Sequence, residues 1–137
     1  MIIDGTIGDD NLTGTASDDL INGLAGNDYI DAGDGNDTIN GGDGEDIIIG
    51  GVGADIIDGG NGNFDHVFYT SSAAGVNVDL SLITAQSGGD AEGDILSNIE
   101  SVFGSSFNDT LNGNVFDNYL IGNDGDDVLY GYGGADN

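Results

Sequence analysis

The sequence predicts an all-β fold in which short parallel strands wind into a solenoid, with two strands and two turns in each 18-residue coil. Three observations predict this fold. A nine-residue unit recurs through both ends of the chain, its sixth place is almost always acidic, and its eighth place is a large aliphatic residue. A three-residue strand points its central side chain to one face. Stacked coils would therefore align the aliphatic residues into two inward ladders, which form a thin core.

The first repeat block, residues 5–67, opens with six regular units. Their sixth places hold Asp10, Asp19, Asp28, Asp37, Asp46 and Asp55, and their eighth places hold Leu12, Ile21, Ile30, Ile39, Ile48 and Ile57. Each unit begins with a glycine-rich run, and glycine adopts the positive φ angles of tight turns without steric strain. In the seventh unit Phe64 displaces the aspartate by one position, so we expect a bulged turn with Asp65 as a doubtful ligand.

The pattern lapses in an irregular interlude, residues 68–103. Gly5 and Gly104 are 99 residues apart, which is eleven units, so we expect the interlude to add whole turns to a single domain of residues 1–137. Val76–Leu80 alternates as a strand does, and residues 95–103 could supply another.

Three acids of the interlude, and His66 just before it, have open roles. Asp90, Glu92 and Asp94 alternate in a glycine-flanked loop, where they could hold a metal ion, although a solvated turn is the favoured interpretation. His66 has no acidic or nucleophilic partner at a readable spacing, and we expect it to be an exposed strand residue.

The second block, residues 104–137, repeats the pattern in four units whose sixth places are Asp109, Asn118, Asp127 and Asp136. Three residues replace the fourth-place glycine of their units: Ser17, Phe107 and Phe116. The turn 113–118, which lacks both the glycine and the acid, should be a weak or vacant site.

The full unit, seen in 41–49 as GGDGEDIII, resembles the RTX family of hemolysin-type calcium-binding repeats, whose nonapeptide is GGxGxDxUx. The resemblance implies a right-handed parallel β-roll that binds calcium in its turns. Calcium takes 6–8 oxygen ligands, and one turn with its carbonyls and one carboxylate offers half of such a shell. Turns two units apart, stacked on one flank, should therefore share an ion.

The candidate ligands follow from this arrangement. They are Asp10, Asp19, Asp28, Asp37, Asp46, Asp55, Asp65, Asp109, Asp127 and Asp136, with the backbone of Gly33, Gly35, Gly42, Gly44, Gly51, Gly53, Gly60 and Gly62. These turns would hold about five to seven calcium ions. Magnesium demands tighter octahedral geometry, and zinc favours His and Cys ligands. The third-place acids, Asp34, Asp43 and Asp124, are interpreted as solvated turn residues.

The charge of the chain limits its partners. It carries 26 acidic residues, one His, and no Lys, Arg or Cys, which gives a net charge of -26. Nucleic acid, anionic membrane and acidic polysaccharide all need a basic patch, so we expect none of them as partners. No apolar run approaches the length of a membrane span. No nucleophile–base pair stands out, so we expect no enzyme activity.

Two functions stay open for a calcium-folded, secreted or cell-surface bacterial protein. The favoured one is a structural protein that assembles head to tail into filaments or a matrix, because repeats run to both ends without a capping unit. The turns of Asp127 and Asp136 would then complete those of Asp10 and Asp19 on a neighbour. The alternative is a repeat module excised from a larger secreted enzyme, toxin or adhesin, which aids folding after type I secretion.

The outward places seven and nine carry more apolar side chains than a free monomer needs. They are Tyr29, Ile47, Ile49, Ile56, Tyr119, Ile121, Val128 and Tyr130. These residues could form a lateral contact surface or could reflect ordinary β-propensity.

Overall fold

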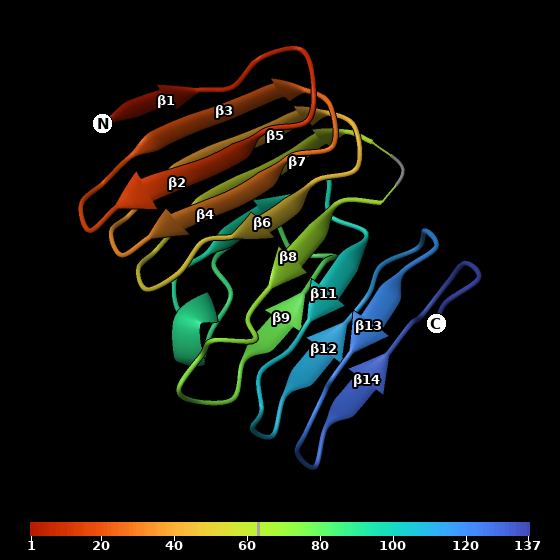
Figure 1. The fold of residues 1–137 in the computed structure, drawn as a ribbon. Coiled ribbons are helices and arrows are strands. Elements are labelled where there is room, and N and C mark those ends of the chain that lie inside the picture. The colour runs from red at the N-terminus through yellow and green to blue at the C-terminus, as the bar shows by residue number, and fades with distance from the viewer. Residues whose placement is uncertain (63) are drawn as a thin grey trace.

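The computed structural model, which describes residues 1–62 and 64–137, is an all-β parallel solenoid, as predicted (Figure 1). The chain alternates between two stacks of strands and advances along the stack with each coil. The two termini therefore lie at opposite ends of the molecule.

The strands form three parallel sheets, whose members follow in spatial order. Sheet A contains β1 (Ile2–Asp4), β3 (Leu20–Ala25), β5 (Thr38–Asp43), β7 (Ile56–Asn61) and β10 (Ile95–Ser97). Sheet B contains β13 (Tyr119–Ile121), β11 (Ser101–Phe103), β8 (His66–Phe68), β6 (Ile47–Ile49), β4 (Tyr29–Gly33) and β2 (Asn11–Thr15). Sheet C contains β14 (Val128–Tyr130), β12 (Thr110–Asn112) and β9 (Asn77–Asp79).

The register of the first block confirms the 18-residue coil. In sheet A Ile21 pairs with Ile39 and Ile39 with Ile57, and in sheet B Leu12 pairs with Ile30 and Ile30 with Ile48. All these eighth-place side chains are at most 9% exposed. They form the two predicted ladders, and in the longer strands the residue two places further on, such as Ala32 in β4, is also buried.

The strands of the interlude still stack on those of the first block, but the interlude is not made only of whole 18-residue turns as expected. It supplies one closed coil, in which β10 pairs with β7 and β11 pairs with β8. The rest is an excursion, residues 69–94, which contains β9 and a single 3-10 turn at Gly89–Ala91. β9 starts sheet C, which takes over from sheet A in the alternation with sheet B. The strands expected at Val76–Leu80 and within residues 95–103 are present as β9, β10 and β11.

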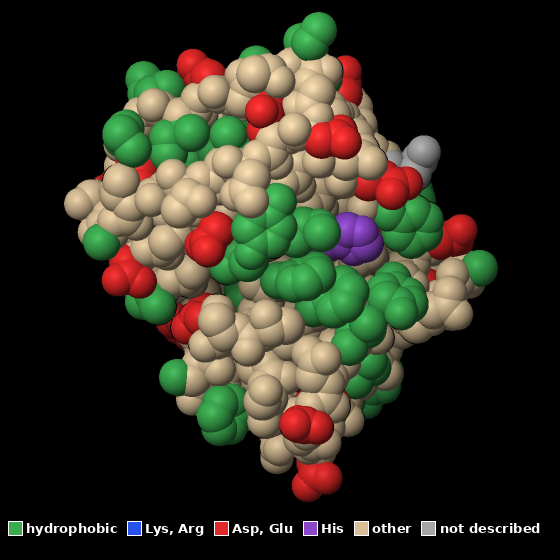
Figure 2. All heavy atoms as spheres, viewed as in Figure 1, with side chains coloured by type: hydrophobic (Ala, Val, Ile, Leu, Met, Phe, Trp, Pro, Cys, Tyr) green, Lys and Arg blue, Asp and Glu red, His purple; other side chains and the backbone are tan. Residues whose placement is uncertain are grey.

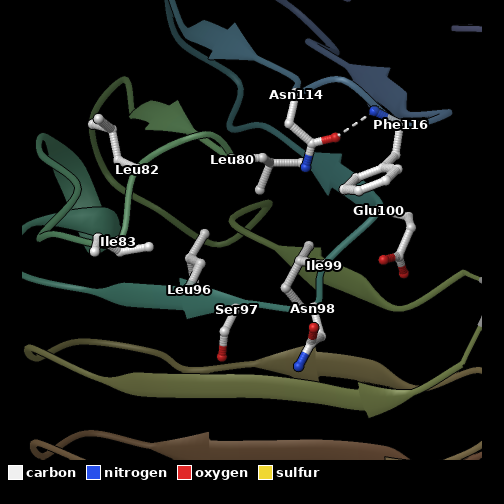
Figure 3. A pocket seen from close by; sticks show the side chains of 10 residues that line it. All are labelled: Leu80, Leu82, Ile83, Leu96, Ser97, Asn98, Ile99, Glu100, Asn114 and Phe116. Carbon is white, nitrogen blue, oxygen red and sulfur yellow. Dashed lines mark hydrogen bonds between the residues drawn. The ribbon is translucent and has the colours of Figure 1, made fainter. Parts of the chain in front are cut away.

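Two features mark the junction between sheets A and C. Gln86, which is 4% exposed, covers the free edge of β9 by accepting the Asp79 N–H at 2.7 Å and donating to the Asp79 carbonyl at 3.3 Å. A mostly apolar cavity of about 260 Å³ lies between Leu80, Leu82 and Ile83 of the excursion and β10 (Figure 3).

The outer face of sheet B carries an apolar patch (Figure 2). Its centre is an aromatic cluster in which the Phe68 and Phe103 ring centroids are 4.1 Å apart, with Tyr119 6.0 Å from Phe103. His66 packs edge-on to Phe103, with ring centroids 5.9 Å apart. It is half-buried, whereas we expected it to be exposed. Whether this patch contacts another molecule stays a prediction.

Candidate metal sites

The sixth-place carboxylates form a column along each flank of the solenoid. Each aspartate precedes a strand, and from the second coil of the first block onward its Oδ1 accepts the backbone N–H of the aspartate one coil earlier. On the flank of sheet A, Asp37 accepts from Asp19 at 2.7 Å, and Asp55 accepts from Asp37 at 2.8 Å. The turns two units apart are thus brought together, as the spacing predicted.

The column on the other flank has the same construction. Asp28 accepts from Asp10 and Asp46 accepts from Asp28, both at 2.8 Å. Asp65 accepts from Asp46 at 2.9 Å, so it continues the column in spite of the additional residue before it. In the second block Asp127 accepts from Asp109 and Asp136 accepts from Asn118.

The second carboxylate oxygen, Oδ2, is unpaired in the middle of both columns. Among the described residues it is buried and has no hydrogen-bond partner at Asp28, Asp37, Asp46, Asp55 and Asp65. These side chains are at most 2% exposed. A buried carboxylate oxygen without a partner costs more free energy than a neutral polar atom does. The columns therefore call for a cation or a proton at these five positions.

Burial changes the titration of these groups in the same sense. It raises the pKa of the Asp28, Asp37 and Asp46 carboxyls above their usual range, and it raises that of Asp55 and Asp65 to about 6. The neighbouring aspartates of each column also raise these pKa values, although the N–H bonds lower them. Without a cation, the ionised columns are strained electrostatically.

The glycine turns bring backbone oxygens close to the repeat carboxylates: a Cβ at Gly62 would lie 2.1 Å from the Gly44 carbonyl oxygen and 2.8 Å from Asp65 Oδ2. A Cβ at Gly51 would lie 1.8 Å from the carbonyl oxygen of Gly33, and one at Gly53 would lie 1.7 Å from that of Gly35. Both Gly51 and Gly53 have positive φ angles, of 98° and 155°. A side chain is therefore excluded twice, by contact and by backbone conformation. The other flank repeats the arrangement, with Gly60 over Gly42 and Gly62 over Gly44.

Buried carboxylate oxygens next to backbone carbonyls are the donor set that calcium takes. In the described part of the chain, no three acidic or imidazole side chains gather at one point. An ion here would consequently be held by few carboxylates and by the backbone of the stacked turns. The residues fit calcium for this reason, and the third-place acids Asp34, Asp43 and Asp124 are exposed, as expected.

At the turn 113–118, whose weak or vacant metal site stays a prediction, the side chain of Asn118 is held by hydrogen bonds within the protein. Asn118 is 2% exposed, and its Oδ1 accepts the Asn114 N–H at 2.7 Å while its amide donates to the Glu100 carbonyl at 3.3 Å. The side chain is thus fully engaged within the protein. Of the two last candidates, Asp127 is half-buried and Asp136 is exposed.

Two acids of the interlude join the columns: Asp94, for which a solvated turn was expected, and Glu100, for which no role was predicted. Asp94, interpreted as a solvated turn acid, is fully buried and accepts the Asp55 N–H at 2.9 Å, so it occupies the next position of the column. Burial raises its pKa to about 7. Glu100 accepts the Asp65 N–H at 2.9 Å and extends the other column.

A local signal could have identified both acids. Asp94 and Glu100 each lie two residues before a buried aliphatic, Leu96 or Val102, as the repeat aspartates do. The Oδ2 atom of Asp94 accepts the Tyr69 hydroxyl at 2.9 Å, whereas Oδ2 is unpaired in the five buried repeat aspartates. Tyr69 is itself 1% exposed.

The fold and the site define a parallel β-roll with oxygen-lined turns. The family model for the RTX calcium-binding nonapeptide repeat matches residues 4–39, 31–63 and 103–137. The chain belongs to this family, and the family binds calcium. No curated protein matches the chain significantly. None of the described helices has the length and apolar character that a membrane crossing requires.

Proposed function

We propose that this chain is a calcium-triggered structural module of a secreted bacterial protein. The proposal rests on the five buried carboxylate oxygens without a partner, in a chain that has 26 acidic residues and no Lys or Arg. The Met1 ammonium group pairs with Asp19 at the first coil, and the chain has no Lys or Arg to neutralise the five unpaired oxygens, so an external cation is the partner that we propose at pH 7.

The proposal makes calcium binding part of folding. The two aliphatic ladders are a single side chain wide, and ordering the backbone costs roughly 1–2 kcal/mol per residue. When a metal site exists only in the folded chain, the binding free energy becomes folding free energy. Extracellular calcium modules bind with dissociation constants of about 10⁻⁴–10⁻³ M. A module of this type would stay unfolded before export and would fold outside the cell.

In this proposal the module is structural rather than catalytic. Its one imidazole, His66, packs against Phe68 and Phe103 in the apolar patch, and its Nδ1 is buried without a hydrogen-bond partner among the described residues. That position suits a packing role.

End-to-end stacking into filaments is a second candidate, which one observation favours. Leu129, the ladder residue of β14, is 41% exposed, whereas the eighth-place ladder residues from Leu12 to Leu120 are at most 9% exposed. A coil from a second copy could cover it and pair with the edge of β14. The turns of Asp10 and Asp19 give this candidate less support, because their carboxylates already accept hydrogen bonds from Thr6 and Thr15.

Circular dichroism of the calcium-stripped chain at pH 7.5 tests the main proposal. We expect a disordered spectrum that converts to a β spectrum at submillimolar to millimolar calcium, and no conversion at the same concentration of magnesium. A full β spectrum in chelator would contradict the proposal. Sedimentation velocity of the calcium-loaded chain over a range of concentrations decides between the candidates: a constant 13.8 kDa species excludes stacking, and growing species support it.

A further inference from the structure

The turns of this solenoid are of two kinds, which differ in the backbone of the second place of the unit. In seven units this residue has a positive φ angle: Leu24, Gly33, Gly42, Gly51, Gly60, Asn123 and Tyr132. In the other four units, where the second place is Thr6, Thr15, Ser105 or Asn114, the φ angle is not positive. We name the first kind open turns and the second kind closed turns.

In every closed turn the second-place N–H donates to the side chain at the sixth place of the same unit. Thr6 donates to Asp10 Oδ2 at 2.5 Å, and Thr15 donates to Asp19 Oδ2 at 2.7 Å. Ser105 donates to Asp109 Oδ2 at 2.7 Å. The fourth case is the bond from Asn114 to Asn118 described above.

Hydroxyl groups add a second bond in three of these turns. Thr6 Oγ1 donates to Asp10 Oδ2 at 3.0 Å, and Thr15 Oγ1 donates to Asp19 Oδ2 at 2.9 Å. Ser105 Oγ donates to the other oxygen of Asp109 at 2.8 Å. The carboxylate oxygen that would face an ion is therefore engaged by its own turn.

Open turns lack this bond, because the left-handed backbone turns the second-place N–H away from the carboxylate. The five buried unpaired oxygens all belong to open turns, at Asp28, Asp37, Asp46, Asp55 and Asp65. Three of the four closed turns also lack the fourth-place glycine, but that glycine alone does not open a turn. The turn 5–10 has a glycine at its fourth place, Gly8, and yet neither Thr6 nor Gly8 has a positive φ angle.

The closed turns also share a location. Units 5–13 and 14–22 are the first two of the first block, and units 104–112 and 113–121 are the first two of the second block. Because successive units lie on alternate flanks, each block begins with one closed turn on each flank. A closed turn thus lies at the start of each regular column of open turns.

We propose that the second-place residue selects whether a turn takes calcium, and that the four closed turns are calcium-free caps at the start of each repeat block. In three of them amide and hydroxyl donors bind the carboxylate oxygens that an ion would bind in an open turn, and in the fourth Asn118 carries no charge. This inference rests on the proposed calcium binding and adds which turns carry it out. If the closed turns bind no calcium, the chain binds fewer ions than the number of its repeat aspartates.

Leu24 offers a matched pair of variants, because it is an open-turn residue with a φ angle of 80°, half exposed, and not a glycine. Leu24→Thr provides a hydroxyl and disfavours the left-handed backbone, so it should close the turn of Asp28. Leu24→Gly relieves the backbone and should keep the turn open, with calcium binding at least as tight. By equilibrium dialysis we expect Leu24→Thr to bind one calcium fewer than Leu24→Gly.

The reverse change is made at Thr6, which is exposed. Thr6→Gly turns residues 5–10 into GGIGDD and should add one ion, whereas Thr6→Ser keeps the hydroxyl and should add none. Equal calcium numbers for the two Leu24 variants would overturn the inference. If Leu24→Thr does not fold, equal numbers for the two Thr6 variants would overturn it instead. A wild-type chain that binds no calcium would remove the proposed function itself, which is a different result.

Discussion

Asp37→Asn separates the role of the ion from the role of the hydrogen bond. Asp37 is 1% exposed, its Oδ1 accepts the Asp19 N–H at 2.7 Å, and its Oδ2 is unpaired. Asparagine has the same shape and keeps the Oδ1 acceptor, but it removes the charge and puts an NH₂ group where the ion would bind. The variant should therefore lose one calcium and little else.

The magnitude follows from binding linkage. One ion at a hundredfold excess over its dissociation constant stabilises the fold by about 2.7 kcal/mol. For a chain of this length, that loss lowers the melting temperature by roughly 10 °C. In chelator the sign reverses, because burial raises the pKa of Asp37 and its ionised form destabilises the ion-free fold. Any residual structure should then be more stable in the variant than in the wild type.

Asp10→Asn is the matched control. Asp10 is half-buried in a closed turn, and its Oδ2 accepts from the Thr6 N–H and hydroxyl, which the asparagine carbonyl can still do. We expect a change within about 0.5 kcal/mol, typical of a surface substitution. Thermal unfolding followed by circular dichroism, at saturating calcium and in chelator, measures both. Equal destabilisation by the two variants at saturating calcium would show that the unpaired oxygen of Asp37 holds no ion.

Three further predictions concern the core and the titration of the columns. Ile39→Ala, in the middle of a ladder and 1% exposed, should cost about 2–5 kcal/mol in urea unfolding at saturating calcium, whereas Leu129→Ala at a 41% exposed position should cost well under half of that. Tyr69→Phe removes the hydroxyl donor of buried Asp94 and should cost about 1–3 kcal/mol in the same assay. Burial raises the folded pKa values of Asp55 and Asp94 to about 6 and about 7, above the unfolded value of 3.8. Their contribution to the stability of the ion-free fold is therefore present below about pH 4 and is lost as the pH rises through 6–7. The β content of the calcium-stripped chain should fall over this range, and a rise would contradict the assigned burial.

The periodic part of the molecule was predictable from sequence because its structure depends only on spacing. A period of nine places the eighth-place aliphatic residues inward, and two units bring Asp37 and Asp55 onto the same flank. The pairing of Ile39 with both Ile21 and Ile57 confirms that inference.

The remainder depends on features that spacing does not encode. Asp94 meets Asp55 across 39 residues, because the excursion leaves and rejoins the stack at a point set by tertiary packing. The difference between open and closed turns lies in a backbone angle. The threonines are visible in the sequence, but their hydrogen bonds to Asp10 and Asp19 are visible only in the structure.

Anomalous diffraction from calcium-loaded crystals is the sharpest test of calcium binding in the open turns, since it locates each ion. We expect an ion beside each of the unpaired oxygens of Asp28, Asp37, Asp46, Asp55 and Asp65, and none beside the Oδ2 atoms held by Thr6 and Thr15. Ordered crystals in which those five carboxylates have no ion at saturating calcium would contradict calcium binding by these columns.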